Sequence, residues 1–148
     1  MEKELVAAAS ITIKASIDQV WNALVRPKLI KKYMVGKEVV TDWKVGSNIV
    51  WKGISNEKPY EDKGKILKVE PAKTLQYSYF TPLSGVKDAP ENYDVLTYEL
   101  SPRGKEVVLK LSHENKKDLQ GLEQSRFICQ KRLDNLKTIL ENQEKKGA

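Results

Sequence analysis

The sequence predicts one α+β domain in which a curved antiparallel sheet of about seven strands wraps a long C-terminal helix, with two short helices after the first strand. The central part of the chain consists of short alternating segments separated by turn residues at intervals of about 8 to 12 residues, which is typical of an antiparallel meander. The last 30 or so residues instead carry apolar side chains at helical spacing. The length of 148 residues suits one domain, so we expect residues 1–148 to form it, with a core from about 9 to 142.

The first elements are predicted to be a strand over Leu5–Lys14 and two short helices. Ser16 and Gln19 have the three-residue spacing of a capping box, which marks the start of the first helix. The residue before a proline is pushed out of the helical region, so this helix ends before Pro27. Proline is also favoured in the first turn of a helix, and we expect a second helix from Pro27 to about Met34.

Six more strands are predicted between turn residues, and a loop of two prolines and a glycine follows the fourth of them. The predicted strands are Glu38–Thr41, Ser47–Gly53, Tyr60–Val69, Thr74–Phe80, Tyr93–Leu100 and Lys105–Ser112, and the loop is Thr81–Asn92. Residues two apart in a strand share a face, which predicts the inward face of the last three strands. That face carries Leu75, Tyr77, Tyr79, Leu96, Tyr98, Leu100, Val107, Leu109 and Leu111.

The terminal helix is predicted from Lys116 to about Glu144, where apolar residues recur at steps of three, four and seven. This stripe consists of Leu122, Cys129, Leu133, Leu136 and Leu140. At 1.5 Å per residue such a helix is roughly 40 Å long, which is enough to cross the sheet.

The charge pattern favours an ordinary solvated surface. The 26 Lys and Arg residues exceed the 20 Asp and Glu residues by six, but they are interleaved with them instead of forming a dense run. We therefore expect no nucleic-acid partner. A single cysteine excludes an intramolecular disulfide, and no segment has the length of a signal-peptide core or a membrane span, so we expect a cytoplasmic monomer without membrane contact.

Four groups of residues carry a resemblance to a known family. They are Ile13, Val20, Trp21 and Leu24; Gly64, Ile66, Leu67, Val69, Glu70 and Pro71; Tyr98, Glu99 and Leu100; and Leu133, Leu136 and Leu140. With them the chain resembles, from about Ala9 to Asn142, the family named for the activator of the Hsp90 ATPase (AHSA1-like), in the START-like or SRPBCC superfamily. The resemblance implies a helix-grip fold with a cavity between the sheet and the last helix. The resemblance also implies that the relatives of this chain are co-chaperone domains or proteins that bind apolar ligands. It implies no catalytic residues shared by the family.

The residues expected to line this cavity combine aromatic rings with a few polar groups, as ligand pockets do. They are Tyr33, Trp51, Tyr77, Tyr79, Tyr98, His113 and Cys129. Each could instead be a core residue, and Tyr33 and Cys129 stand where the family usually has Trp. We expect His113 to be structural, because no carboxylate partner is visible, and Cys129 to be a packed thiol. One His and one Cys cannot complete a metal site, so no metal or cofactor is expected.

Carboxylate pairs such as Glu61 and Asp62 are placed beside turns, where we expect solvated charge. The sequence shows no set of acid, base and nucleophile residues that would act together. We therefore consider an enzyme less favoured than a binding protein. The first hypothesis is a non-catalytic domain, related to stress, that holds a lipid, polyketide or flavonoid-like molecule in a closed apolar cavity. The alternative is an Hsp90-type co-chaperone-like module that meets an acidic chaperone surface through Lys28, Lys31 and Lys32.

Overall fold

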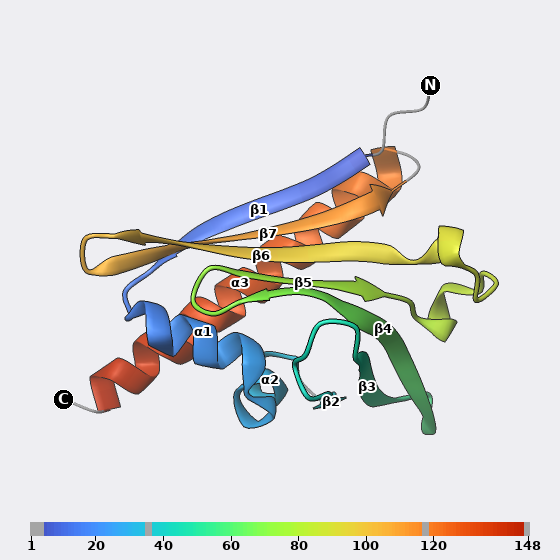
Figure 1. Ribbon diagram of the computed structural model, residues 1–148, viewed down its shortest axis with the longest axis horizontal. Helices are drawn as coiled ribbons and strands as arrows, with labels where there is room; N and C mark the ends of the chain where they lie inside the picture. Colours follow the sequence, from blue (N-terminus) through green and yellow to red (C-terminus); the bar gives the residue numbers. More distant parts are fainter. Residues whose placement is uncertain (1–4, 35–36, 117–118, 147–148) are drawn as a thin grey trace.

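The computed structural model describes residues 5–34, 37–116 and 119–146, and these form an antiparallel sheet of seven strands in the order β1-β7-β6-β5-β4-β3-β2. The strands are β1 (Leu5–Ile13), β2 (Glu38–Val40), β3 (Asn48–Ser55), β4 (Lys58–Glu70), β5 (Thr74–Tyr79), β6 (Asp94–Arg103) and β7 (Glu106–Lys116). The long helix α3 (Leu119–Lys146) runs diagonally across one face of this sheet (Figure 1). The predicted α+β helix-grip arrangement is therefore confirmed.

The two short helices begin and end at the residues that the sequence indicates. In α1 (Ile17–Val25) the Ser16 hydroxyl accepts a hydrogen bond from the Gln19 amide at 3.1 Å, and the Gln19 side chain accepts one from the Ser16 amide at 2.9 Å. This reciprocal pair is the predicted capping box. Proline then opens α2 (Pro27–Tyr33), so the two helices meet at a sharp corner and cover one end of the sheet (Figure 1).

The strands β3, β4, β6 and β7 are longer than predicted, and β4 and β7 differ most. β4 begins at Lys58 instead of Tyr60, because Asn56 and Glu57 both have positive φ, at 51° and 65°, and make a two-residue hairpin turn. This geometry matches the right-handed twist of paired strands. β7 continues to Lys116, beyond the predicted end at Ser112, and there it pairs with the beginning of β1. The predicted loop Thr81–Asn92 contains two short 3-10 turns, at Pro82–Ser84 and Pro90–Asn92.

The sheet bends sharply along β4, which pairs with β3 from Lys58 to Lys65 and with β5 from Ile66 to Glu70. At the bend, a Cβ atom on Gly64 would lie 1.7 Å from the carbonyl oxygen of Ser78. Only glycine allows the two backbones to approach this closely. The bend carries β2 and β3 round toward the side of the sheet that faces α3.

The core lies between the sheet and α3. The predicted helical stripe is confirmed for Cys129, Leu133, Leu136 and Leu140, which are all fully or almost fully buried, whereas Leu122 is half-buried. Helix α3 packs chiefly against β1 and β7 and also contacts α1 and α2. The inner faces of β3 and β5 therefore lack the close packing against α3 that β1 and β7 have.

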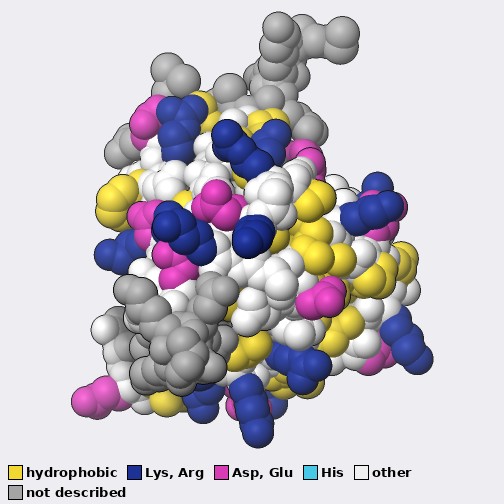
Figure 2. All heavy atoms as spheres, turned by 90° about the vertical axis from the view of Figure 1, so that its left-hand side faces the viewer, with side chains coloured by type: hydrophobic (Ala, Val, Ile, Leu, Met, Phe, Trp, Pro, Cys, Tyr) yellow, Lys and Arg dark blue, Asp and Glu magenta, His cyan; other side chains and the backbone are white. Residues whose placement is uncertain are grey.

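The surface mixes charges of both signs. Figure 2 shows one face of the molecule, where Lys and Arg side chains are interspersed with Asp and Glu side chains and with apolar groups. On the described part of this face the positive charges do not gather into one dense patch. This distribution agrees with the interleaved sequence, and the expected lack of a nucleic-acid partner stays a prediction.

Candidate functional site

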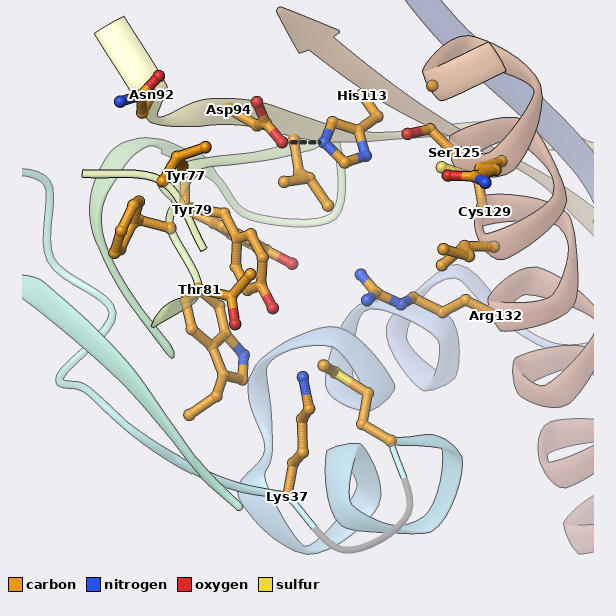
Figure 3. Close-up of a pocket in the computed structure, with 18 of the residues that line it drawn as sticks. Lys37, Tyr77, Tyr79, Thr81, Asn92, Asp94, His113, Ser125, Cys129 and Arg132 are labelled. Carbon is orange, nitrogen blue, oxygen red and sulfur yellow. Dashed lines mark hydrogen bonds and ion pairs between the residues drawn. The ribbon is translucent and has the colours of Figure 1, made fainter. Parts of the chain in front are cut away.

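A pocket of about 610 Å³ lies between α3 and the inner face of the sheet, where the helix leaves the strands uncovered (Figure 3). Its apolar wall includes Trp51, Tyr77, Tyr79, Phe80, Leu96 and Ile128. Its polar groups include Lys37, Asp94, His113, Ser125 and Arg132. The volume falls within the roughly 300 to 1,000 Å³ of small-molecule sites. The expectation of a closed cavity is thus wrong, because the pocket opens on one side, and charged side chains reach it beside the apolar groups that the sequence predicted.

Three aromatic rings, from β3 and β5 on either side of β4, form the strand side of the pocket. The Trp51 ring centroid lies 5.0 Å from that of Tyr77 and 5.1 Å from that of Tyr79, and both ring pairs are tilted or edge-on. Aromatic rings attract each other in such arrangements, by about 0.5 to 1.5 kcal/mol for each pair. The wall is therefore held in place by its own contacts before any ligand enters.

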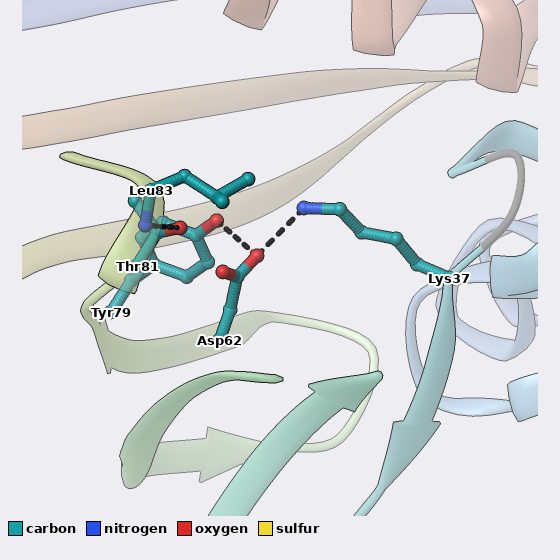
Figure 4. Close-up of polar contacts among 5 residues, drawn as sticks. All are labelled: Lys37, Asp62, Tyr79, Thr81 and Leu83. Carbon is teal, nitrogen blue, oxygen red and sulfur yellow. Dashed lines mark hydrogen bonds and ion pairs between the residues drawn. The ribbon is translucent and has the colours of Figure 1, made fainter. Parts of the chain in front are cut away.

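A buried carboxylate, Asp62, joins the Tyr79 side of this wall to Lys37 (Figure 4). Asp62 Oδ2 accepts a hydrogen bond from the Tyr79 hydroxyl at 2.6 Å and one from Lys37 Nζ at 2.7 Å, and the Asp62 side chain has no exposed surface. The expectation of solvated charge at Glu61 and Asp62 is therefore wrong for Asp62 and right for Glu61, which is exposed. Asp62 stands opposite Trp51 in the β3–β4 register, and opposite residues share a face of a sheet.

His113 faces the pocket at its other end and has a carboxylate partner that the sequence did not reveal. Its Nε2 lies 2.7 Å from Asp94 Oδ2 (Figure 3). His113 stands opposite Leu96 on β6, and Asp94 stands opposite Tyr79 on β5, so the register brings all four side chains to the same face. The hydrogen bond holds the imidazole ring in one orientation toward the pocket.

Arg132 enters the pocket from α3, three residues after Cys129 in the same buried stripe (Figure 3). Its Nη1 donates a hydrogen bond to the Tyr98 hydroxyl at 3.2 Å. A guanidinium carries five N–H donors and stays protonated in proteins, so this contact leaves most of its hydrogen-bonding capacity available. Arg132 therefore brings a positive charge to a mostly aromatic pocket.

Burial raises the pKa of Tyr33, Tyr77 and Tyr79 well above the ordinary value of a phenol. For Tyr79 the hydrogen bond to Asp62 raises the pKa further, because the Tyr79 hydroxyl must keep its proton to donate it. These three tyrosines are therefore neutral hydroxyl groups at physiological pH and not sources of negative charge.

Five of the seven predicted cavity residues lie on the pocket wall, namely Trp51, Tyr77, Tyr79, His113 and Cys129. Tyr33 lines a smaller adjoining hollow of about 220 Å³ and donates its hydroxyl to the Ala23 carbonyl at 2.9 Å, which ties α2 to α1. Tyr98 lies behind Tyr77, with ring centroids 6.4 Å apart, and reaches the site through Arg132. Whether any of these residues contacts a ligand stays a prediction.

The sequence reasoning missed Lys37, Asp62, Asp94 and Arg132. Asp62 alternates with Gly64 and Ile66, which are both buried, so strand parity could have placed it inside. Arg132 directly precedes Leu133 of the helical stripe, which puts it at the edge of the buried face. Asp94 lies two residues before Leu96 in the predicted strand Tyr93–Leu100, so the same parity could have placed it inside. Lys37 carries no such signal, because it lies between α2 and β2.

No group of three or more His, Cys, Asp and Glu side chains among the described residues is arranged to hold a metal ion. Within the same residues, every helix is too short or too polar to span a bilayer. The cytoplasmic location, the monomeric state and the lack of a cofactor stay predictions.

Comparison with known proteins agrees with the fold and the order of the elements. The sequence matches the family described as Activator of Hsp90 ATPase homolog 1-like protein over residues 14–141. No curated protein matches the sequence. The chain is 45% identical to ChR145 from Cytophaga hutchinsonii, whose solution structure it matches with a TM-score of 0.87 over 98% of this chain and 99% of that one.

Two more distant structures share the fold. The Aha1 dimer from Colwellia psychrerythraea is 21% identical, with a TM-score of 0.74 over 93% of this chain and 96% of that one. DynU16, from the dynemicin biosynthetic locus, is 13% identical, with a TM-score of 0.74 over 92% of this chain and 47% of that one. Since the family match covers most of the sequence and includes β3 to β7, the chain belongs to the Activator of Hsp90 ATPase homolog 1-like family.

Proposed function

We propose that this protein is a non-catalytic binding domain that holds an apolar small molecule, of lipid, polyketide or flavonoid type, between the sheet and α3. The observation that carries the proposal is the pocket of about 610 Å³ with Trp51, Tyr77 and Tyr79 along one wall. The shared fold with a protein of the dynemicin biosynthetic locus is compatible with a ligand of this kind.

The apolar wall supplies the main source of affinity for such a ligand. Removing about 100 Å² of apolar ligand surface from water contributes about 2.5 kcal/mol. Micromolar affinity corresponds to about 8 kcal/mol, before the cost of restricting the ligand is included. A ligand must therefore bury several hundred square ångströms, which a pocket of about 610 Å³ can accommodate.

The chemistry of the wall supports binding over catalysis. The Lys37 and His113 side chains are each held by a carboxylate of the protein, Asp62 and Asp94 respectively. Such pairs fix the shape of the pocket and give a ligand polar groups that set its orientation. The rest of the wall consists mainly of aromatic rings and aliphatic groups. It therefore offers few polar groups that could act as acid, base or nucleophile on a substrate.

The experiment titrates delipidated protein with fatty acids, flavonoids and sterols and follows Trp fluorescence and amide chemical shifts. Trp51 lies in the pocket, so a bound ligand should change its emission, and the shifted amides should cluster on β3, β5 and α3. Absence of any saturable change at micromolar ligand would contradict the proposal.

A blocking variant localises the binding. Cys129 is 2% exposed and lines the pocket, so Cys129→Phe should fill part of it and weaken binding, whereas Cys129→Ala adds no volume and should bind. Equal affinity of the two folded variants would place the ligand elsewhere on the molecule.

A second candidate function is an Hsp90-type co-chaperone-like module, and family membership together with the exposed Lys28, Lys31 and Lys32 of α2 favours it. An acidic partner surface would be attracted by these charges, more strongly at low salt. Pull-downs and ATPase assays with an Hsp90-type chaperone test it. Replacing the three lysines by Glu should abolish association, and the same change at the exposed Lys105 and Lys110 is the control.

A further inference from the structure

Arg132 differs from the other basic side chains of the pocket, Lys37 and His113, in its partners. Lys37 is paired with Asp62 at 2.7 Å, and His113 is paired with Asp94 at 2.7 Å. Arg132 donates to the hydroxyl of Tyr98, and no carboxylate among the described residues forms an ion pair with it. The described part of the pocket therefore contains one arginine charge without a counter-ion.

The direction of the side chain makes this charge available to a ligand. Figure 3 shows the guanidinium of Arg132 extending from α3 into the pocket, on the side that faces the tyrosine rings and Lys37. Arg132 is neither fully buried nor fully exposed. Placing an unpaired cation in a partly dry site is costly, and an anion that enters the site removes this cost.

The chemical class of the anion follows from the number and shape of the donors. A guanidinium presents parallel N–H groups that match the two oxygens of a carboxylate, and such charge-assisted pairs are among the stronger hydrogen bonds in proteins. Lys37 is already paired with Asp62, so among the Lys and Arg side chains of the described pocket wall Arg132 is the one without a carboxylate at ion-pair distance. That favours a monoanion over a doubly charged phosphate.

We infer that the ligand of this pocket is an amphiphilic carboxylic acid, whose carboxylate pairs with Arg132 and whose apolar body lies on the rings of Trp51, Tyr77 and Tyr79. The inference rests on the proposed binding function and names the ligand class for the same pocket. Fatty acids and aromatic carboxylic acids both have this combination of groups.

The test compares ligands that share a chain and differ only in the head group. Laurate, dodecanol and dodecyl phosphate are titrated into the delipidated protein at about pH 8, where a carboxylic acid is ionised, below their aggregation concentrations and with Trp fluorescence as the readout. The wild type should bind laurate about tenfold or more tightly than dodecanol, and more tightly than dodecyl phosphate.

Variants assign the preference to the arginine. Arg132→Gln should bring the affinity for laurate down to that for dodecanol and leave the affinity for dodecanol unchanged. Arg132→Met should have the same two effects. Because methionine keeps the apolar stem of the side chain, this variant replaces Arg132→Gln if the glutamine variant fails to fold. Lys131→Gln removes the same charge from the exposed neighbouring position and should keep the preference.

The possible failures are distinguishable. If the wild type binds dodecanol and laurate equally, the carboxylate inference is overturned and the proposed binding function stands. A preference for dodecyl phosphate, or a preference for laurate that persists in both arginine variants, also overturns it. If flavonoids or sterols bind and laurate does not, the carboxylate inference is overturned and the proposed binding function stands. If none of these ligands binds, the proposed function fails and the inference fails with it.

Discussion

Asp62 and Lys37 form an ion pair of 2.7 Å in which the Asp62 side chain is fully buried and the Lys37 side chain is 24% exposed. The pair links the segment after α2 to the middle of β4, and the Lys37 Nζ also lies 5.9 Å from the centres of the Tyr60 and Tyr79 rings. This contact joins the helical corner to the aromatic wall of the pocket.

Asp62→Asn should destabilise the protein by about 2–4 kcal/mol, because it leaves Lys37 and the Tyr79 hydroxyl without their charged acceptor. The estimate lies below that for a fully buried pair, since water partly screens Lys37. Urea denaturation followed by Trp fluorescence measures the change. The control is Glu61→Gln, at the exposed neighbouring position, which should change the free energy of unfolding by less than about 0.5 kcal/mol.

Tyr79→Phe removes only the hydroxyl that donates to Asp62 at 2.6 Å, and we expect a smaller loss of about 1–2 kcal/mol. The ring, with its contact to Trp51, is kept. In a double-mutant cycle with Asp62→Asn the two losses should not add, because Tyr79→Phe removes the same hydrogen bond that Asp62→Asn weakens. Additive losses would show that the Tyr79 hydroxyl contributes independently of Asp62.

The buried tyrosines predict a fall in stability at alkaline pH. Burial raises the pKa of Tyr33, Tyr77 and Tyr79 above that of the unfolded chain, which is about 10. Below that value both states hold the protons and the contribution is complete. Above it the unfolded chain releases protons that the native state retains, so the free energy of unfolding decreases as the pH rises.

Absorbance at 295 nm checks this directly, because it reports ionised phenols. At about pH 11 the folded protein should show fewer ionised tyrosines than the six in the sequence, and concentrated urea at the same pH should expose all of them. Complete ionisation of the folded protein at that pH would mean that these hydroxyls are not buried.

Gly64→Ala should destabilise the sheet by about 3 kcal/mol, because its Cβ would lie 1.7 Å from the Ser78 carbonyl oxygen and the two strands must move apart. Gly104→Ala is the matched control. Gly104 has a φ of 63°, and alanine in this left-handed conformation costs about 1 kcal/mol, but no atom lies within 4 Å of the added Cβ. The two variants compared by urea denaturation should therefore differ by about 2 kcal/mol, and an equal loss would contradict the close approach at the bend.

Periodicity predicted the parts of this fold that depend on repeated patterns. Leu133, Leu136 and Leu140 repeat often enough to define a buried helix face, and Leu109 and Leu111 define a strand face. The pocket depends on single pairs instead. Asp94 and His113 lie 19 residues apart, and Lys37 and Asp62 lie 25 apart, so only the strand register and the bend at Gly64 bring them together.

The position of α3 after all seven strands of the described chain has a consequence for biosynthesis. The strand β1, made first, pairs with β7, the last strand to be made, and the apolar side of the sheet is covered only when α3 has left the ribosome. Contacts between distant parts of the chain slow folding. We therefore expect the domain to fold after synthesis of α3, with its inner aromatic rings exposed to chaperones until the final helix docks.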